Sequence, residues 1–175
     1  MQKSNIALIG MMGSGKSFSS KRLGELLKRE VVSTDQLIEE KEKKAVSQIF
    51  TDSGEIYFRD IEKAVVKEIA AKHGAILDCG GGIVLNKENI DILKKDAVVF
   101  YLSATPEFLL KQVKLSGKIK RPLLNVPDPL AKLKSILLAR GPLYEQAADH
   151  IIDADNKTIE QICQDILAII QEGKK

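Results

Sequence analysis

Short apolar segments of strand length alternate along the chain with longer segments whose apolar residues recur at helical spacing. Residues 5–10 (NIALIG) form an apolar run that ends in glycine, whereas residues 55–72 place Ile61, Val65, Ile69 and Ala70 on one helical face. The same reasoning predicts strands at residues 31–33, 75–79, 97–103 and 150–154 and helices at residues 22–30, 36–44, 106–115, 129–147 and 158–172. Strands separated by helices pair in parallel with right-handed crossovers, so the pattern predicts a layered α/β fold.

Composition narrows the class of protein. The 175 residues are 44% hydrophobic and 29% charged, without a repeat or a linker, so residues 1–175 are expected to form a single domain. The net charge of +3 is too small to indicate nucleic-acid binding. No apolar run reaches the roughly 18 residues that cross a bilayer, and the N-terminus does not resemble a signal peptide. Cys79 and Cys163 are interpreted as reduced thiols of a cytoplasmic protein, and Cys79 as a small buried residue rather than a reactive one.

Residues 10–17 (GMMGSGKS) match the phosphate-loop pattern G-x-x-x-x-G-K-[ST] between an apolar strand and a helix. The glycines let successive backbone N–H groups point at an anion, and the helix that follows adds its positive N-terminal end. Lys16 can reach the β- and γ-phosphates, and the Ser17 hydroxyl can bind Mg²⁺. The expected contacts with ATP are Gly13, Ser14, Gly15, Lys16, Ser17 and Phe18. The motif alone does not separate a kinase from a GTPase or from a nucleotide-gated binding protein.

Five more motifs follow in order: STDQLIEE (33–40), GEIYFRD (54–60), GGG (80–82), GKIKRPLLN (117–125) and ARGPLYEQA (139–147). Together with the phosphate loop they resemble the shikimate kinases, from Ile6 to about Ile152. The resemblance implies a P-loop NTPase-type three-layer sandwich, with a five-stranded parallel sheet in the order 2-3-1-4-5, helices on both faces and a mobile lid. It also implies phosphorylation of the 3-hydroxyl of shikimate by ATP, with Mg²⁺, to give shikimate 3-phosphate for chorismate and aromatic amino-acid biosynthesis.

A carbocyclic acid with several hydroxyl groups suits the residue types in these motifs. Arginine binds a carboxylate bidentately, and the resemblance assigns this role to Arg59 and Arg140. Asp35 can accept hydrogen bonds from the hydroxyl groups, orient the attacking oxygen and take its proton. The ring could lie against the bare backbone of Gly80, Gly81 and Gly82. Helices within about residues 34–61 would carry much of this site.

Each of these side chains also has a purely structural explanation. Asp35 could cap the helix that follows it. Arg59 could pair with Asp60 or Glu62, and Arg140 could pair with Glu145 on its own helix. The neighbouring aromatic residues are interpreted as core or pocket wall: Tyr57, Phe58 and Tyr144.

Residues 111–125 contain four lysines, Arg121, a glycine and a proline, but no acidic residue, and are interpreted as the lid. Arg121 is expected to stabilise the charge of the transferred phosphoryl group while the closed lid expels water. Catalysis is thus assigned to Lys16, Asp35 and Arg121, and the lysines are interpreted as solvated. Lys114 stands where the family often has an arginine stacked on adenine, and Lys157 is expected on the other side of the base.

The metal site departs from the family pattern. Shikimate kinases usually have an aspartate two residues before the substrate-binding one, where this chain has Ser33. They commonly have a small hydroxyl residue where this chain has Asp78, and in many phosphate-loop proteins an aspartate at such a strand end holds Mg²⁺. Our hypothesis is that the carboxylate has moved, so that Asp78 and Ser17 are the metal residues. Alternatively, Asp78 caps a turn through a hydrogen bond to the backbone.

Three functions remain open at this point: a shikimate kinase, another small-metabolite kinase such as a gluconate or nucleoside monophosphate kinase, and a non-catalytic nucleotide sensor. Two arginines and three consecutive glycines favour a compact acid as the acceptor. The presence of Lys16, Ser17, Asp35 and Arg121 argues against the sensor. The expected partners are shikimate and ATP, and the chain is expected to be a monomer.

Overall fold

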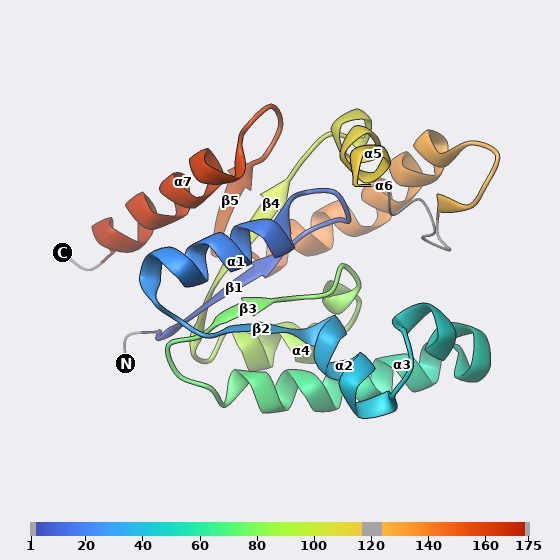
Figure 1. Cartoon of the computed structure of the whole chain (residues 1–175), viewed down its shortest axis with the longest axis horizontal. Coiled ribbons are helices and arrows are strands. Elements are labelled where there is room, and N and C mark those ends of the chain that lie inside the picture. Colours follow the sequence, from blue (N-terminus) through green and yellow to red (C-terminus); the bar gives the residue numbers. More distant parts are fainter. Residues whose placement is uncertain (1–2, 117–123, 174–175) are drawn as a thin grey trace.

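The computed structural model describes residues 3–116 and 124–173 (Figure 1). Arg121 and the central part of the predicted lid, residues 117–123, lie outside these described residues. The helices are α1 (Lys16–Leu27), α2 (Thr34–Glu42), α3 (Val46–Ala70), α4 (Lys87–Leu93), α5 (Pro106–Leu115), α6 (Pro129–Ala147) and α7 (Ile159–Glu172). In the described part of the chain, no helix is both long and apolar enough to span a membrane.

One parallel sheet forms the centre of the fold. Its strands are β1 (Asn5–Ile9), β2 (Val31–Ser33), β3 (Ile76–Asp78), β4 (Ala97–Ser103) and β5 (His150–Asp153). They are arranged in the order β2-β3-β1-β4-β5, and every neighbouring pair is parallel. The predicted fold class and strand order are therefore confirmed.

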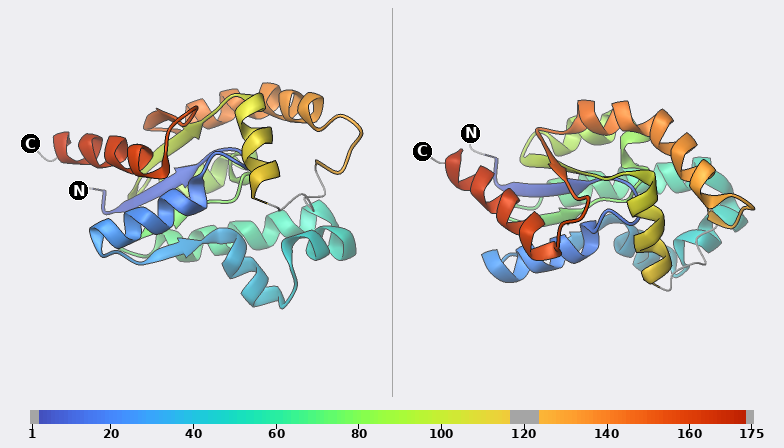
Figure 2. Two further views of the ribbon diagram at one scale, coloured as in Figure 1. Left: turned by 45° about the horizontal axis from the view of Figure 1, so that its top comes forward. Right: turned by 90° about the horizontal axis from the view of Figure 1, so that it is seen from above.

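The two faces of the sheet bury different sets of helices (Figure 2). On one face, alternate strand residues such as Ile9 and Leu77 pack with α3, α4 and the C-terminal end of α6. On the other face, Leu8 and Ile76 pack with Leu23 of α1 and with α7. Because successive side chains of a strand point to opposite faces, nearly continuous apolar strands are what a sheet covered on both sides requires.

The helix boundaries differ from the predicted ones where local geometry overrides apolar spacing. Helix α1 begins at Lys16, directly after the phosphate loop. Helix α3 begins at Val46 and contains a kink at Gly54, whose φ is 81°, so the predicted start at residue 55 marks its second part. A short 3₁₀ helix, η1 (Ile83–Leu85), and α4 were not predicted.

Candidate active site

The phosphate loop joins β1 to α1 and has the backbone that its glycines permit. Gly13 and Gly15 have φ values of 84° and 88°, in the left-handed region that favours glycine. A Cβ on Gly13 would also lie 2.7 Å from the Leu109 carbonyl oxygen of α5. No side chain in the described part of the chain caps α1, so its first N–H groups can receive an anion. The buried Lys16 donates a hydrogen bond from Nζ to the Met11 carbonyl oxygen at 3.1 Å.

The three consecutive glycines make room for two side chains of the site. A Cβ on Gly80 would overlap Oδ1 of Asp35, and a Cβ on Gly82 would lie 2.8 Å from Cζ of Arg59. The Gly80 N–H donates a hydrogen bond to Thr34 Oγ1 at 2.7 Å, which ties the loop to the start of α2. Close packing of the protein's own side chains is thus a second reason for glycine here, besides the predicted approach of a ring.

Asp35 lies in the first turn of α2, and its interpretation as a helix cap is wrong. The cap is Ser33, whose Oγ accepts a hydrogen bond from the Gln36 N–H at 3.4 Å. The Asp35 carboxylate instead lies against Gly80, at the carboxyl edge of the sheet. A carboxylate at this edge is placed where ligands of parallel α/β proteins bind.

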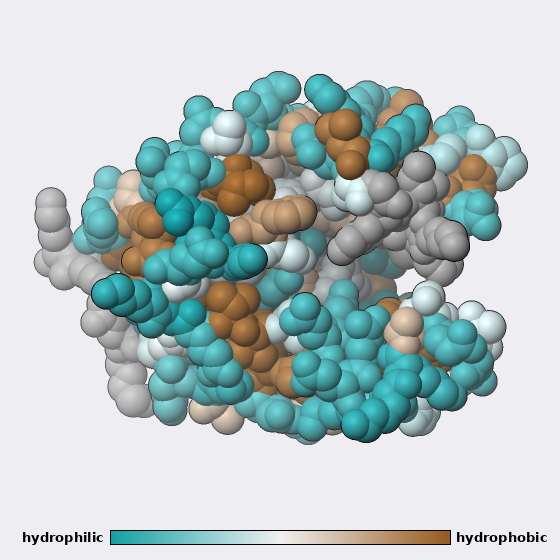
Figure 3. Space-filling view, viewed as in Figure 1, coloured by the Kyte–Doolittle hydropathy of each residue, from teal (hydrophilic) through white to brown (hydrophobic). Residues whose placement is uncertain are grey.

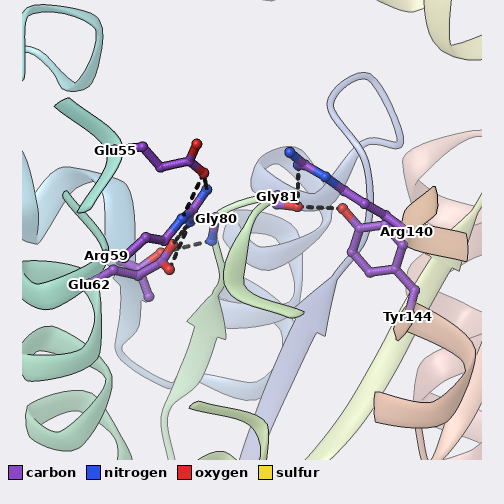
Figure 4. Close-up of polar contacts among 8 residues, drawn as sticks. Glu55, Arg59, Glu62, Gly80, Gly81, Arg140 and Tyr144 are labelled. Carbon is purple, nitrogen blue, oxygen red and sulfur yellow. Dashed lines mark hydrogen bonds and ion pairs between the residues drawn. The ribbon is translucent and has the colours of Figure 1, made fainter. Parts of the chain in front are cut away.

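Arg59 is held by two carboxylates of its own helix (Figure 4). Its Nη1 donates to both oxygens of Glu62 at 2.9 and 3.0 Å, and its Nη2 donates to Glu55 Oε1 at 3.2 Å. Glu62 is buried, and this burial raises the pKa of its carboxyl group, although the Arg59 guanidinium opposes the shift. The pairing that the sequence offered as an alternative therefore exists. It fixes Nη1, so an acceptor carboxylate would have to take Nε and Nη2 from the exposed Glu55.

Arg140 and Tyr144 of α6 both reach the triple-glycine loop. Arg140 Nη1 donates to the Gly81 carbonyl oxygen at 3.3 Å, and the Tyr144 hydroxyl donates to the same oxygen (Figure 4). Tyr144 is fully buried and stacks on Tyr101 with ring centroids 4.9 Å apart. Burial raises the pKa of Tyr144 to about 12, so the hydroxyl remains a donor at neutral pH. The sequence predicted the burial of Tyr144 but not this hydrogen bond, or the anchoring of Arg59 by Glu62.

These elements meet at the triple-glycine loop. Arg59 and Arg140 approach residues 80–82 from opposite sides (Figure 4), and a Cβ on Gly81 would lie 3.5 Å from the Gly10 carbonyl oxygen of the phosphate loop. The molecular surface is mainly hydrophilic in Figure 3 and is hollowed between the α5–α6 side and the α2–α3 side. A cavity of about 430 Å³ includes Arg59 and Glu55 in its wall but does not extend to Asp35 or Arg140. The arrangement suits a small anionic acceptor beside a bound triphosphate.

Other predicted site residues lie on α1, on α5 and just before α7, not on the triple-glycine loop. Ser17 lies in the first turn of α1, and Phe18 is 69% exposed. Lys114 lies in the last turn of α5, and Lys157 Nζ pairs with Asp165 of α7 at 2.9 Å. Their contacts with adenine stay a prediction, as does the role of Arg121.

Both cysteines are buried free thiols, as expected. Burial raises the pKa of the Cys79 thiol well above its usual range and that of Cys163 to about 11. Neither thiol is therefore a nucleophile at neutral pH.

A divalent metal ion would depend on the nucleotide as well as on the protein. The described residues contain no group of three or more metal-binding His, Cys, Asp or Glu side chains. The Ser17 hydroxyl and the Asp78 carboxylate are hard oxygen donors of the kind that Mg²⁺ prefers, and Mg²⁺ is commonly held by one or two protein groups plus phosphates and water. The residues present thus fit a magnesium–nucleotide complex.

Comparisons with known proteins agree over nearly the whole chain. A protein-family model described as "Shikimate kinase" matches residues 12–171. A shikimate kinase of Dehalococcoides mccartyi is 42% identical over 164 residues, which are 94% of this chain and 92% of that protein. One of Symbiobacterium thermophilum is 39% identical over 168 residues, or 96% and 97% of the two chains. The solved structure of a shikimate kinase from Acinetobacter baumannii in complex with shikimate has a TM-score of 0.92 and 34% identity, and the match covers 98% of this chain and 95% of that one. The chain therefore belongs to the shikimate kinase family.

Proposed function

We propose that the protein transfers the γ-phosphoryl group of ATP to the 3-hydroxyl of shikimate. The observation that carries this proposal is the placement of Arg59 and Arg140 on opposite sides of residues 80–82, next to the phosphate loop. Two guanidinium groups beside one carboxylate, Asp35, suit an acceptor that has a single carboxylate and several hydroxyl groups. The likeness to a kinase solved with shikimate supports the same acceptor.

The roles of the residues follow from their chemistry. Lys16 and the first N–H groups of α1 would hold the β- and γ-phosphates, and Arg59 and Arg140 would bind the acceptor carboxylate. Asp35 would orient the attacking hydroxyl and accept its proton. Arg121, in the lid over about residues 111–125, would stabilise the charge that develops on the phosphoryl oxygens. Magnesium, held by Ser17 and Asp78, would neutralise charge on the phosphates.

Further parts of the proposal concern the whole chain. Residues 1–175 would act as one kinase domain, with acceptor-binding helices within about residues 34–61. Adenine would lie between Lys114 and Lys157, near Phe18. The two free thiols suit the reducing cytoplasm, where we place a monomeric enzyme.

A coupled assay of ADP release tests the acceptor. Purified protein is given Mg²⁺ and ATP with shikimate, gluconate or AMP in separate reactions. We expect shikimate to stimulate ADP release, and gluconate and AMP not to stimulate it. Stimulation by gluconate or AMP would assign the site to another small-metabolite kinase, and ATP binding without stimulation by any acceptor would indicate a nucleotide sensor.

A further inference from the structure

We infer that Asp78 supplies, toward the nucleotide-bound magnesium, the carboxylate that the position of Ser33 lacks. The inference rests on the proposed function, because it concerns the metal of the same ATP. It goes beyond that function by predicting that a charge has been exchanged between two neighbouring strands. Three observations support it: the register of β2 and β3, the burial of Asp78, and the capping of α2 by Ser33.

Register places Asp78 and Ser33 side by side. Ser33 and Asp78 are Cα partners in the parallel pair β2–β3, and Leu8 of the strand that leads into the phosphate loop is the partner of Asp78 on the other side. Partnered residues of adjacent strands point to the same face of a sheet. A carboxylate on either residue is therefore offered to the same side, one strand apart.

That side is the one where α1 begins. Ile76, two residues before Asp78, packs in the cluster that contains Leu23 of α1. Val31, two residues before Ser33, lies with its Cβ 3.8 Å from the position of a Cβ on Gly24 of α1. Because side chains alternate along a strand, Asp78 and Ser33 face the α1 layer as well. They lie at the carboxyl ends of their strands, at the sheet edge where α1 starts with Lys16 and Ser17.

The surroundings of the Asp78 carboxylate favour binding of a cation. Asp78 is only 8% exposed, yet its carboxylate accepts no hydrogen bond and forms no ion pair within residues 3–116 and 124–173. The alternative in which Asp78 caps a turn is therefore wrong. A buried carboxylate without a partner costs stability unless a bound ion compensates it.

Ser33 is the N-cap of α2, and an aspartate at this position could cap the helix in the same way. Its hydroxyl caps α2 at Gln36. Aspartate and serine are about equally good N-caps. A Ser33→Asp substitution can thus restore a carboxylate at the position usual in the family without removing the cap, and Asp78→Ser gives the small hydroxyl residue common there.

The test measures metal and nucleotide binding without acceptor. Calorimetric titration with a non-hydrolysable ATP analogue, with and without Mg²⁺, is combined with electron paramagnetic resonance of Mn²⁺ in the protein–nucleotide complex. Asp78→Asn is expected to reduce the gain in nucleotide affinity from Mg²⁺ by about tenfold. The double variant Ser33→Asp/Asp78→Ser is expected to recover it to within about threefold of the original protein, and Asp91→Asn, at an exposed residue paired with Lys87, should leave it unchanged.

The outcomes separate the inference from the proposed function. If Asp78→Asn keeps the original Mg²⁺ dependence and the original Mn²⁺ spectrum, the inference is overturned even though shikimate phosphorylation stands. If Asp78→Asn does not fold, the double variant decides: recovered metal dependence supports the exchange, and loss of folding or of metal dependence rejects it. Without nucleotide, a melting temperature of Asp78→Asn equal to or above the original is expected, because the variant relieves a buried charge.

Discussion

Arg59 is bound by two carboxylates that differ in burial, and this difference determines which of its donors a ligand could take over. Glu62 is 1% exposed and faces Nη1, whereas the Glu55 side chain is 61% exposed and shares Oε1 between Nε and Nη2 of Arg59. The buried partner positions the guanidinium. The exposed partner occupies the edge with which arginine binds a carboxylate bidentately, so it would compete with the proposed acidic acceptor for the same donors.

Glu55→Gln should therefore lower the KM for shikimate. Exposed ion pairs contribute about 0.2–1 kcal/mol, so a decrease of up to about fivefold is expected, with little change in kcat. Steady-state kinetics at saturating ATP measure the effect. Glu68→Gln, at an exposed pair with Lys41, is the matched control and should leave the KM unchanged. An unchanged or higher KM for Glu55→Gln would show that Glu55 does not compete.

The buried Tyr144 hydroxyl, which donates a hydrogen bond to the triple-glycine loop, should make the stability of the protein depend on pH. Its pKa is raised to about 12, mainly by burial, whereas an unfolded tyrosine titrates near 10. Between these values the unfolded chain loses its proton first, so the stabilisation present below pH 10 is lost as the pH rises toward 12. We expect the original protein to lose about 1.5–2 kcal/mol more unfolding free energy than Tyr144→Phe from pH 9.5 to pH 11.5, measured by urea denaturation. Equal losses would show that the pKa of Tyr144 is not raised in the folded protein.

At the scale of elements, the loop after β3 is a junction of three helices. It contacts Asp35 of α2, Arg59 of α3 and Arg140 of α6 within three consecutive glycines. A methyl group on Gly80 or Gly82 would displace side chains that we propose to bind the acceptor, while the phosphate loop would keep its own backbone. Acceptor binding and nucleotide binding should therefore be separable by mutation.

Gly80→Ala and Gly82→Ala should each lower kcat/KM for shikimate by about 100-fold or more, because displacement of a positioned group by about 1 Å is enough for such a loss. Affinity for an ATP analogue, measured by calorimetry, should change less than about twofold. Gly141→Ala in α6 is the control. Nothing lies within 4 Å of a Cβ there, and the helical glycine makes a gain of about 0.5–1 kcal/mol in unfolding free energy the expected result. A parallel loss of ATP affinity in the loop variants would contradict the separation.

The elements of the fold were predictable because apolar spacing records burial on two faces of a sheet. The start of α3 at Val46 was missed because residues 46–53 precede the kink at Gly54, and α4 was missed because it has only seven residues. The candidate site was predicted from motifs, but its internal contacts were not. The overlap of Gly80 with Asp35 and the hydrogen bond from Tyr144 to Gly81 depend on tertiary packing between distant segments.

At the scale of the whole molecule, the sheet brings two binding regions to one edge. The phosphate loop follows β1, and the glycine loop follows β3, which pairs directly with β1. A Cβ on Gly81 would lie 4.0 Å from the Met12 backbone nitrogen, so the two loops are in contact. The topology thus brings the proposed donor and acceptor sites next to each other, as direct transfer between them would require.

Phosphorus NMR of a reaction that contains the purified protein, Mg²⁺, ATP and shikimate tests this juxtaposition most directly. We expect a new phosphomonoester signal coupled to the proton on carbon 3 of shikimate, growing in step with ADP. Conversion of ATP to ADP and inorganic phosphate alone, or no conversion despite bound ATP, would show that the two regions do not form a shikimate kinase site.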